Sequence, residues 1–167
     1  MGTTTLLPVG EYLSRRYRPD REYVDGQLVE RNVGEYDHAR LQGLVFAYLL
    51  RNERKWSIRA VPECRVQVKP ARYRIPDVCA LRTDSPIEQI VETPPLLCIE
   101  ILSPEDRLSE MQGRIDDYLA MGVPYVWTID PRMRRAWVTT KDGAHEAKDG
   151  VLRAGEIIQV PLAELFD

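Results

Sequence analysis

Two carboxylates lie where the surrounding sequence is apolar enough to bury them. Glu100 interrupts the apolar run 96–102, and Asp77 follows Pro76 in an alternating run upstream. A buried, ionised carboxylate is costly unless it pairs with a cation or coordinates a metal. If the two runs form neighbouring strands, both carboxylates converge, and their hard oxygen atoms suit Mg²⁺ or Mn²⁺. The pattern therefore predicts a divalent-metal site at Asp77 and Glu100, with pairing to an arginine or capping of a helix as the structural alternative.

The strands that would position these acids follow from hydrophobic alternation. Residues 64–68 and 73–81 alternate apolar and polar side chains, which is typical of half-exposed strands. Asp77 lies on the same face of its run as Cys79. The nearly continuous apolar runs are typical of central strands buried on both faces, and they cover residues 96–102 and 125–129. Further short strands are expected at 136–140 and 151–160.

Two helices and a hairpin complete the expected elements. Apolar residues spaced i, i+3, i+4, i+7 and i+8 predict an amphipathic helix over residues 36–54. Another helix is expected to begin at Ser103, a good N-cap residue, and to end at Gly122. The pair Asp25-Gly26 between short apolar runs predicts a hairpin over residues 21–31.

The order of these elements predicts an α/β fold, a mixed sheet flanked by helices. With 167 residues of ordinary globular composition, the chain is expected to form a single domain over residues 1–167. The sequence contains no apolar run of about eighteen residues, so we expect no membrane partner. An odd number of cysteines, all within apolar runs, favours a cytoplasmic location, where thiols stay reduced.

The charge of the chain is unevenly distributed along its length. The net charge is −3, yet residues 1–75 hold 14 Lys and Arg against 9 Asp and Glu, and residues 76–167 hold 9 against 17. The basic surplus permits a nucleic-acid partner without demanding one, because the whole chain lacks the strongly basic footprint of proteins that coat nucleic acids.

Four short motifs follow one another along the chain: DREYVDG at 20–26, IPDV at 75–78, IEILSP at 99–104 and GVPYVW at 122–127. Together they resemble the Uma-two-type restriction endonuclease family, from about residue 10 to the end of the chain. The resemblance implies a restriction-endonuclease-like fold of the PD-(D/E)XK superfamily. It also implies Mg²⁺ bound by an Asp and a Glu, which match Asp77 and Glu100 in this sequence.

The resemblance further implies a catalytic lysine four residues before Tyr118, and this position is Arg114 here. Arginine keeps a positive charge for a phosphate, but its very high pKa denies it a role as a general base. The structural alternative is an exposed helix residue that pairs with Glu110. A helix beginning at Ser103 would place Arg114 about 15 Å from its start, which is far for direct contact. Lys69, or no protein base, is the remaining option.

Three more residues are expected as a third metal ligand or as support for the site: Glu22, His38 and Glu63. A lone histidine on a polar helix face is usually solvated, which is the alternative for His38. The alternative for Glu22 is an ion pair with one of the nearby arginines, Arg15, Arg16, Arg18 and Arg21.

These features predict a Mg²⁺- or Mn²⁺-dependent endonuclease that hydrolyses phosphodiester bonds in DNA. The alternative is a catalytically degenerate module on the same fold that binds nucleic acid or protein. Because double-strand cleavage needs one site for each strand, we also expect a homodimer. Its contact is expected to involve Trp137, Leu162, Leu165 and Phe166, and the equal alternative is that these residues cap the core.

Overall fold

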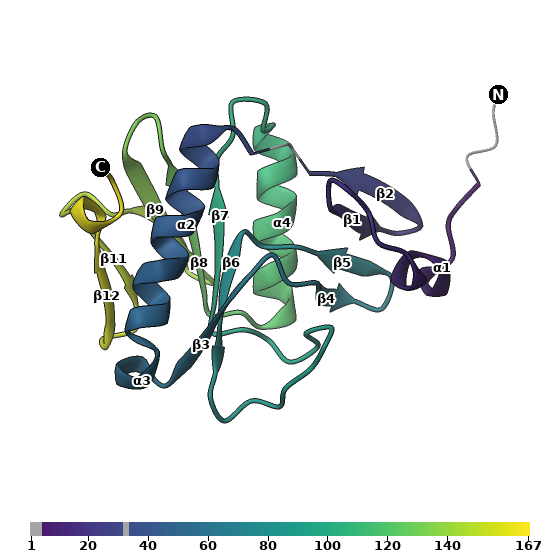
Figure 1. Cartoon of the computed structure of the whole chain (residues 1–167), viewed down its shortest axis with the longest axis horizontal. Coiled ribbons are helices and arrows are strands. Elements are labelled where there is room, and N and C mark those ends of the chain that lie inside the picture. Colours follow the sequence, from purple (N-terminus) through teal and green to yellow (C-terminus); the bar gives the residue numbers. More distant parts are fainter. Residues whose placement is uncertain (1–4, 32–33) are drawn as a thin grey trace.

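The central sheet of the protein has the strand order β10-β9-β8-β7-β6-β3. A computed structural model describes residues 5–31 and 34–167 of the chain (Figure 1). Strands β7 and β8 run parallel, and the other neighbours in this sheet pair antiparallel. The strands are β3 Ile58–Pro62, β6 Val78–Arg82, β7 Leu97–Ile101, β8 Tyr125–Asp130, β9 Arg135–Thr140 and β10 Gly143–Glu146.

One face of the central sheet is covered by α2 (Tyr36–Arg51), which leads into the short α3 (Glu53–Trp56). Leu41, Val45 and Leu49 recur at the spacing of one helical turn and belong to one apolar core with side chains of β6, β7 and β8. This face therefore supplies the largest part of the hydrophobic core.

The end of the chain packs on the same core. β11 (Val151–Ala154) and β12 (Ile158–Pro161) form a hairpin, followed by the 3₁₀ turn Leu162–Glu164. Leu162 and Leu165 are buried in this core. Of the two alternatives expected for Leu162 and Leu165, the structure shows capping of the core and not a dimer contact, because a side chain that closes the core of its own chain cannot face a partner.

The opposite face of the central sheet is covered by α4 (Leu108–Met121), which connects the parallel strands β7 and β8. Met111, Ile115 and Tyr118 share a core cluster with Cys79 and Cys98 of the sheet. This strand–helix–strand crossover confirms the arrangement predicted for residues 96–129, and the mixed α/β fold is confirmed with it.

A smaller antiparallel sheet has the strand order β2-β1-β5-β4 and lies beyond α4, beside α1 (Figure 1). Tyr12 of α1 stacks on Tyr23 and contacts Tyr73, so aromatic rings hold this part together. The predicted hairpin over residues 21–31 is confirmed by β1 and β2. The bounds are α1 Val9–Ser14, β1 Arg21–Val24, β2 Gln27–Glu30, β4 Val66–Lys69 and β5 Arg72–Arg74.

Several elements of the structure differ from those that the sequence predicts. The run 73–81 is not one strand: β5 ends at Arg74 in the smaller sheet and β6 begins at Val78 in the central sheet, with Pro76 between them. Proline lacks the N–H that a ladder needs, so it suits this junction. Strand β3 was not predicted, and the helix expected over 36–54 is divided into α2 and α3.

The predicted start of α4 is also wrong. The helix begins at Leu108 instead of following Ser103, because the backbone N–H of Ser103 donates to Asp106 Oδ2 at 2.7 Å and holds residues 103–106 in a turn. Among the described residues, no helix combines the length and the apolar character that crossing a membrane requires.

Candidate active site

Asp77 lies at the junction between β5 and β6 and is buried. Its Oδ2 accepts a hydrogen bond from the backbone N–H of Ile101 at 2.7 Å and lies 3.3 Å from His38 Nε2, and its Oδ1 accepts one from the Arg31 guanidinium. Burial alone would raise the pKa of Asp77, but the hydrogen bond from His38 and the charge of Arg31 outweigh it and lower the pKa. Asp77 is therefore held as a carboxylate.

Glu100 lies on β7, surrounded by protein on all sides. Its Oε1 accepts a hydrogen bond from the hydroxyl of Tyr118 at 2.6 Å. Burial, reinforced by the negative charge of Asp77, raises the pKa of Glu100 to about 8. The two carboxylates thus have opposite shifts, which is a common property of functional pairs.

The register of β6 and β7 explains why the two carboxylates meet. Val78 pairs with Ile99, and continuing this antiparallel register brings Asp77 beside Glu100 on the face that packs against α4. Both line one cavity of about 20 Å³, which we call the carboxylate cavity. Its lining consists of Arg31, His38, Asp77, Glu100, Ile101, Ser103, Asp106 and Arg114. The predicted convergence of Asp77 and Glu100 is what the structure shows.

Arg114 also lines the carboxylate cavity and is buried, which excludes the alternative of an exposed residue paired with Glu110. Its Nε lies 3.5 Å from Glu22 Oε2, and its Nη1 lies 3.7 Å from Asp106 Oδ1. Because α4 begins at Leu108, Arg114 is only about 9 Å along the helix, so the expected separation of 15 Å is wrong.

Glu22 supports the site without lining the cavity. It is fully buried; its Oε1 accepts a hydrogen bond from the backbone N–H of Ile75 at 3.0 Å and its Oε2 accepts one from Arg74 Nη1 at 3.0 Å. Arg74 Nε donates in turn to Asp117 Oδ2 at 2.7 Å. This Glu22–Arg74–Asp117 chain joins the smaller sheet to α4. The expected pairing of Glu22 with the arginines at 15–21 is wrong, since the partners come from β5 and α4.

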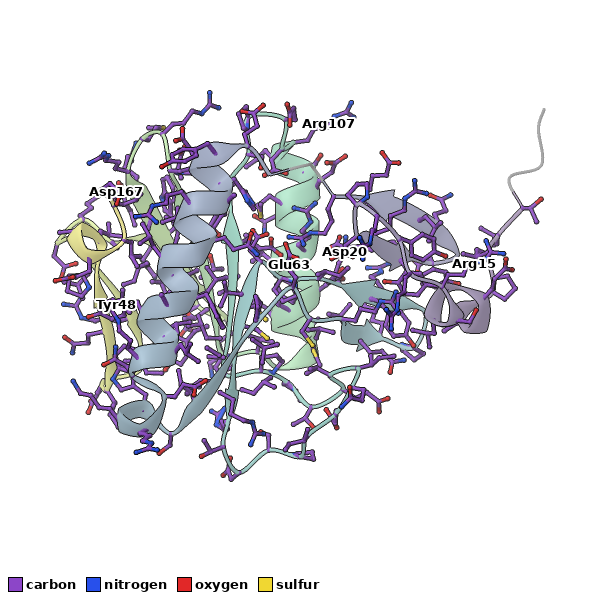
Figure 2. The ribbon with its side chains drawn as sticks, viewed as in Figure 1. Arg15, Asp20, Tyr48, Glu63, Arg107 and Asp167 are labelled. Atoms are coloured by element: carbon purple, nitrogen blue, oxygen red, sulfur yellow. The ribbon has the colours of Figure 1, made fainter. Side chains whose placement is uncertain are left out.

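His38 and Glu63 occupy different positions at the site. His38 is not solvated as its helix face suggested: its side chain is only 13% exposed and contacts Asp77. Glu63 lies at the rim, with Oε1 3.9 Å from Arg31 Nη1 and accepting a hydrogen bond from Gln42 at 3.2 Å. Figure 2 labels Glu63 near the centre of the view, between α2 and α4. His38 thus belongs to the cavity, and Glu63 to its entrance.

Arg31 is the principal site residue that sequence reasoning missed. It follows β2 directly, and its side chain is only 12% exposed against Asp77. The cost of burying Asp77 predicts some cation beside it, but nothing in the local pattern distinguishes Arg31 from the other arginines of the chain. The hydroxyl contact of Tyr118 with Glu100 was also missed, because the ring of Tyr118 packs in the apolar cluster under α4 and the local sequence does not show where its hydroxyl lies.

The donor set of the carboxylate cavity fits a hard divalent cation bound by two carboxylates and solvent oxygen. The pKa of Glu100 is raised first by burial and then by the negative charge of Asp77, and a bound cation would lower this pKa by stabilising the ionised carboxylate. Mg²⁺ commonly keeps several waters and takes only one or two carboxylates. Within residues 5–31 and 34–167, no group of three or more His, Cys, Asp or Glu side chains is arranged to hold an ion. Within the described residues, solvent, backbone or substrate oxygen atoms would complete the coordination of such a cation.

Comparison with known proteins defines the class to which this fold and site belong. Residues 10–165 match the model of the Uma2 family, described as "Putative restriction endonuclease", and the chain belongs to this family. The resemblance found in the sequence motifs is therefore confirmed.

The fold is similar to a crystal structure of a protein from Anabaena variabilis that is described as a putative nuclease belonging to DUF820. The two share 21% sequence identity with a TM-score of 0.81, and the match covers 94% of this chain and 96% of that one. At this identity the similarity establishes the fold. A search of curated proteins found no match.

Proposed function

We propose that the protein is a divalent-metal-dependent nuclease that hydrolyses phosphodiester bonds in DNA, with Mg²⁺ or Mn²⁺ bound by Asp77 and Glu100. One observation carries the proposal: two buried carboxylates from neighbouring strands face one cavity that opens beside two arginines. Membership of a restriction endonuclease family supports a nucleic-acid substrate.

Each residue around the cavity has a distinct task in this proposal. Arg31, His38 and the Ile101 N–H hold Asp77 ionised, and Tyr118 fixes the orientation of Glu100. A divalent cation, when bound, supplies a lowered pKa for coordinated water and neutralises charge on the phosphate. Arg114 stabilises the developing negative charge electrostatically and does not act as a base.

The second candidate is a module that binds nucleic acid without turnover. The observation that favours it is the ion pair between Arg31 and Asp77, which places a guanidinium on a proposed metal ligand. In addition, no lysine lines the carboxylate cavity among the residues that the structure describes.

Cleavage assays separate the two candidates. Purified protein is incubated with plasmid and with single-stranded DNA in Mg²⁺ or Mn²⁺, alongside Asp77→Asn, Glu100→Gln and the distant control Glu156→Gln. The nuclease proposal requires cleavage by wild type and Glu156→Gln and its loss in both site variants. Variants that cleave like wild type would contradict the site assignment. DNA binding without cleavage by wild type would favour the binding module.

We further propose that the nuclease acts in the cytoplasm as a homodimer, so that two carboxylate cavities serve the two strands of a duplex. Of the expected contact residues, Leu162 and Leu165 are buried in the core, and a contact through Trp137 is not part of this proposal. Sedimentation equilibrium over a tenfold range of concentration checks this proposal, because a monomer at every concentration would contradict it.

A further inference from the structure

A larger groove lies next to the carboxylate cavity, between α4 and the strands β8, β9 and β10. Its volume is about 410 Å³, which is within the range of small-molecule sites and far above the volume of the carboxylate cavity, about 20 Å³. It shares Ser103 and Asp106 with the carboxylate cavity, so the two adjoin. We call it the Trp137 groove; among its lining residues are Leu108, Met111, Ile115, Thr128, Trp137 and Thr139.

The sheet register aligns this groove with the proposed metal ligands. Glu100 pairs with Thr128 across β7 and β8, and Thr128 pairs with Trp137 across β8 and β9. These three side chains form one row across the face that packs against α4. Because neighbouring strands lie about 4.8 Å apart, Trp137 is about 10 Å from Glu100. A ligand bound at the carboxylate cavity therefore needs to extend only a short way to reach the indole.

Trp137 forms a rigid, half-buried aromatic surface in the groove. The Arg135 guanidinium carbon lies 5.3 Å from the indole centroid. Arg135 is itself fixed by two hydrogen bonds to Glu146, at 2.6 and 2.8 Å. Arg135 is not among the residues that line the groove, whereas Trp137 is. The cation–π contact therefore holds the ring in place, and the indole keeps surface in the groove for a ligand.

The groove also offers an unused hydrogen-bonding group and positive charge. Thr128 is 93% buried, and within the part of the chain that the structure describes its hydroxyl has no hydrogen-bond partner. A buried hydroxyl without a partner costs free energy that a polar ligand can recover. Arg107 and Arg132 contribute cations to the lining, and Figure 2 shows Arg107 near the upper end of α4. Asp106 and Asp130 line the groove too and balance these cations, so it is the aromatic face and the hydroxyl that match a nucleobase.

We propose that the Trp137 groove binds an unpaired nucleobase of the substrate, stacked on Trp137, while a neighbouring phosphate reaches the carboxylate cavity. The inference rests on the proposed function and narrows its substrate to DNA with a single-stranded segment beside the cleaved bond. A base within a duplex is stacked on both faces and cannot present one to a side chain, whereas an unpaired base can.

The test measures binding in metal-free buffer, so that no probe is cleaved. Fluorescence anisotropy compares a labelled oligonucleotide of eight thymidines with an abasic oligonucleotide of equal length, which has the same phosphates without bases. We expect wild type to bind the thymidine probe about tenfold more tightly, since base–aromatic stacking contributes an effect of that size. Trp137→Leu should remove this difference and leave the affinity for the abasic probe unchanged.

Two further variants keep the result interpretable. Thr128→Val retains the shape of the side chain and should lower only the affinity for the thymidine probe, by about threefold. Ile157→Ala, at an exposed residue outside the groove, should behave like wild type. Thermal unfolding of each variant shows that it is folded. A base preference that persists in Trp137→Leu, or its absence in wild type, would overturn the inference.

The remaining outcomes distinguish this inference from the proposed function. DNA cleavage by wild type without any base-dependent binding contradicts the groove and leaves the nuclease standing. Base-dependent binding that requires Trp137, without cleavage, supports the groove and contradicts the nuclease. If Trp137→Leu converts a dimer to a monomer in sedimentation, the groove is an interface between two copies of the chain, and the inference is wrong.

Discussion

The two faces of strand β7 carry opposite kinds of residue. Ile99 and Ile101 point to the α2 face and join a core made of apolar side chains, whereas Cys98 and Glu100 point to the α4 face. The acids, cations and hydroxyl of the site come from the α4 face and its borders. Burial of apolar surface stabilises a fold at about 25 cal/mol per Å², whereas burial of charge costs free energy that ion pairs only partly offset. Both faces contribute apolar core, but only the α4 face also carries buried charges, whose cost offsets part of that stabilisation.

The largest expected effect comes from changing two adjacent, fully buried residues, one on each face of β7. These changes test whether the two faces have different roles. Glu100→Gln should lower cleavage about a thousandfold, because several kcal/mol of transition-state stabilisation are lost, and should keep the fold. Ile99→Ala should lower the free energy of unfolding by about 2–5 kcal/mol and leave the rate per folded molecule unchanged. Urea unfolding and single-turnover cleavage measure both; equal effects on both quantities would contradict the division of roles.

Arg114 tests whether charge on the α4 face takes part in chemistry. Arg114→Ala should slow cleavage about tenfold to a hundredfold, because positive charge beside the phosphate is lost. Arg114→Lys should raise cleavage severalfold, since an amine is the group that the family resemblance implies at this position. Asp116→Asn, an exposed change on the same helix, is the control. Unchanged single-turnover rates in both Arg114 variants would remove this residue from the site.

Tyr118 connects the packing of α4 to the orientation of Glu100. Tyr118→Phe keeps the ring in the core and removes the hydroxyl that donates to Glu100. We expect Mn²⁺ affinity to fall about tenfold, as for other groups that orient a metal ligand, with a loss of about 1 kcal/mol in unfolding free energy. Calorimetric titration with Mn²⁺ measures the affinity without a cleavage assay. Unchanged affinity would show that the hydrogen bond does not position Glu100.

The smallest effect is a gradual dependence of stability on pH. Because the pKa of Glu100 is raised to about 8 in the folded protein, the folded state binds this proton more tightly than the unfolded state. Metal-free protein should therefore lose stability as the pH rises from about 4.5 to about 8, by several degrees in Tm. Asp77, whose pKa is lowered in the folded protein, has the opposite effect: stability falls as the pH falls below the usual aspartate pKa near 4.

A pair of variants identifies the source of this pH dependence. Glu100→Gln should flatten the dependence of Tm on pH between 5 and 8, whereas Ile99→Ala should lower Tm and keep the slope. Differential scanning calorimetry in chelator measures each curve. An unchanged slope in Glu100→Gln would assign the titration to another group.

Elements with a strong local signal could be predicted, and junctions could not. The periodicity of Leu41, Val45 and Leu49 identifies α2 because one helix face meets one apolar surface. The break at Pro76 was missed because alternation continues through it, although the two halves belong to different sheets. The late start of α4 depends on the bond between the Asp106 carboxylate and the Ser103 N–H, which competes with the expected cap.

The site residues that could be predicted are those whose burial is evident from the local sequence. Asp77 and Glu100 stand out because their apolar strands make a charge expensive, and that argument needs no tertiary structure. Their partners are distant in sequence: Arg31 lies 46 residues before Asp77, and Arg74 lies 52 residues after Glu22. Such partners depend on how two sheets dock, and many arginines satisfy the same local rules.

The Glu22–Arg74–Asp117 chain affects how the protein responds to dissolved salt. Its side chains are at most 10% exposed, so ions in solution have little access to these pairs, in contrast to the surface pair of Arg40 with Asp167. Salt near 1 M shortens the range of exposed electrostatic interactions to about 3 Å and weakens contacts with phosphates. High salt should therefore release nucleic acid bound in the proposed function, while the smaller sheet stays attached to α4. Nucleic acid should thus be removable under conditions in which the protein stays folded.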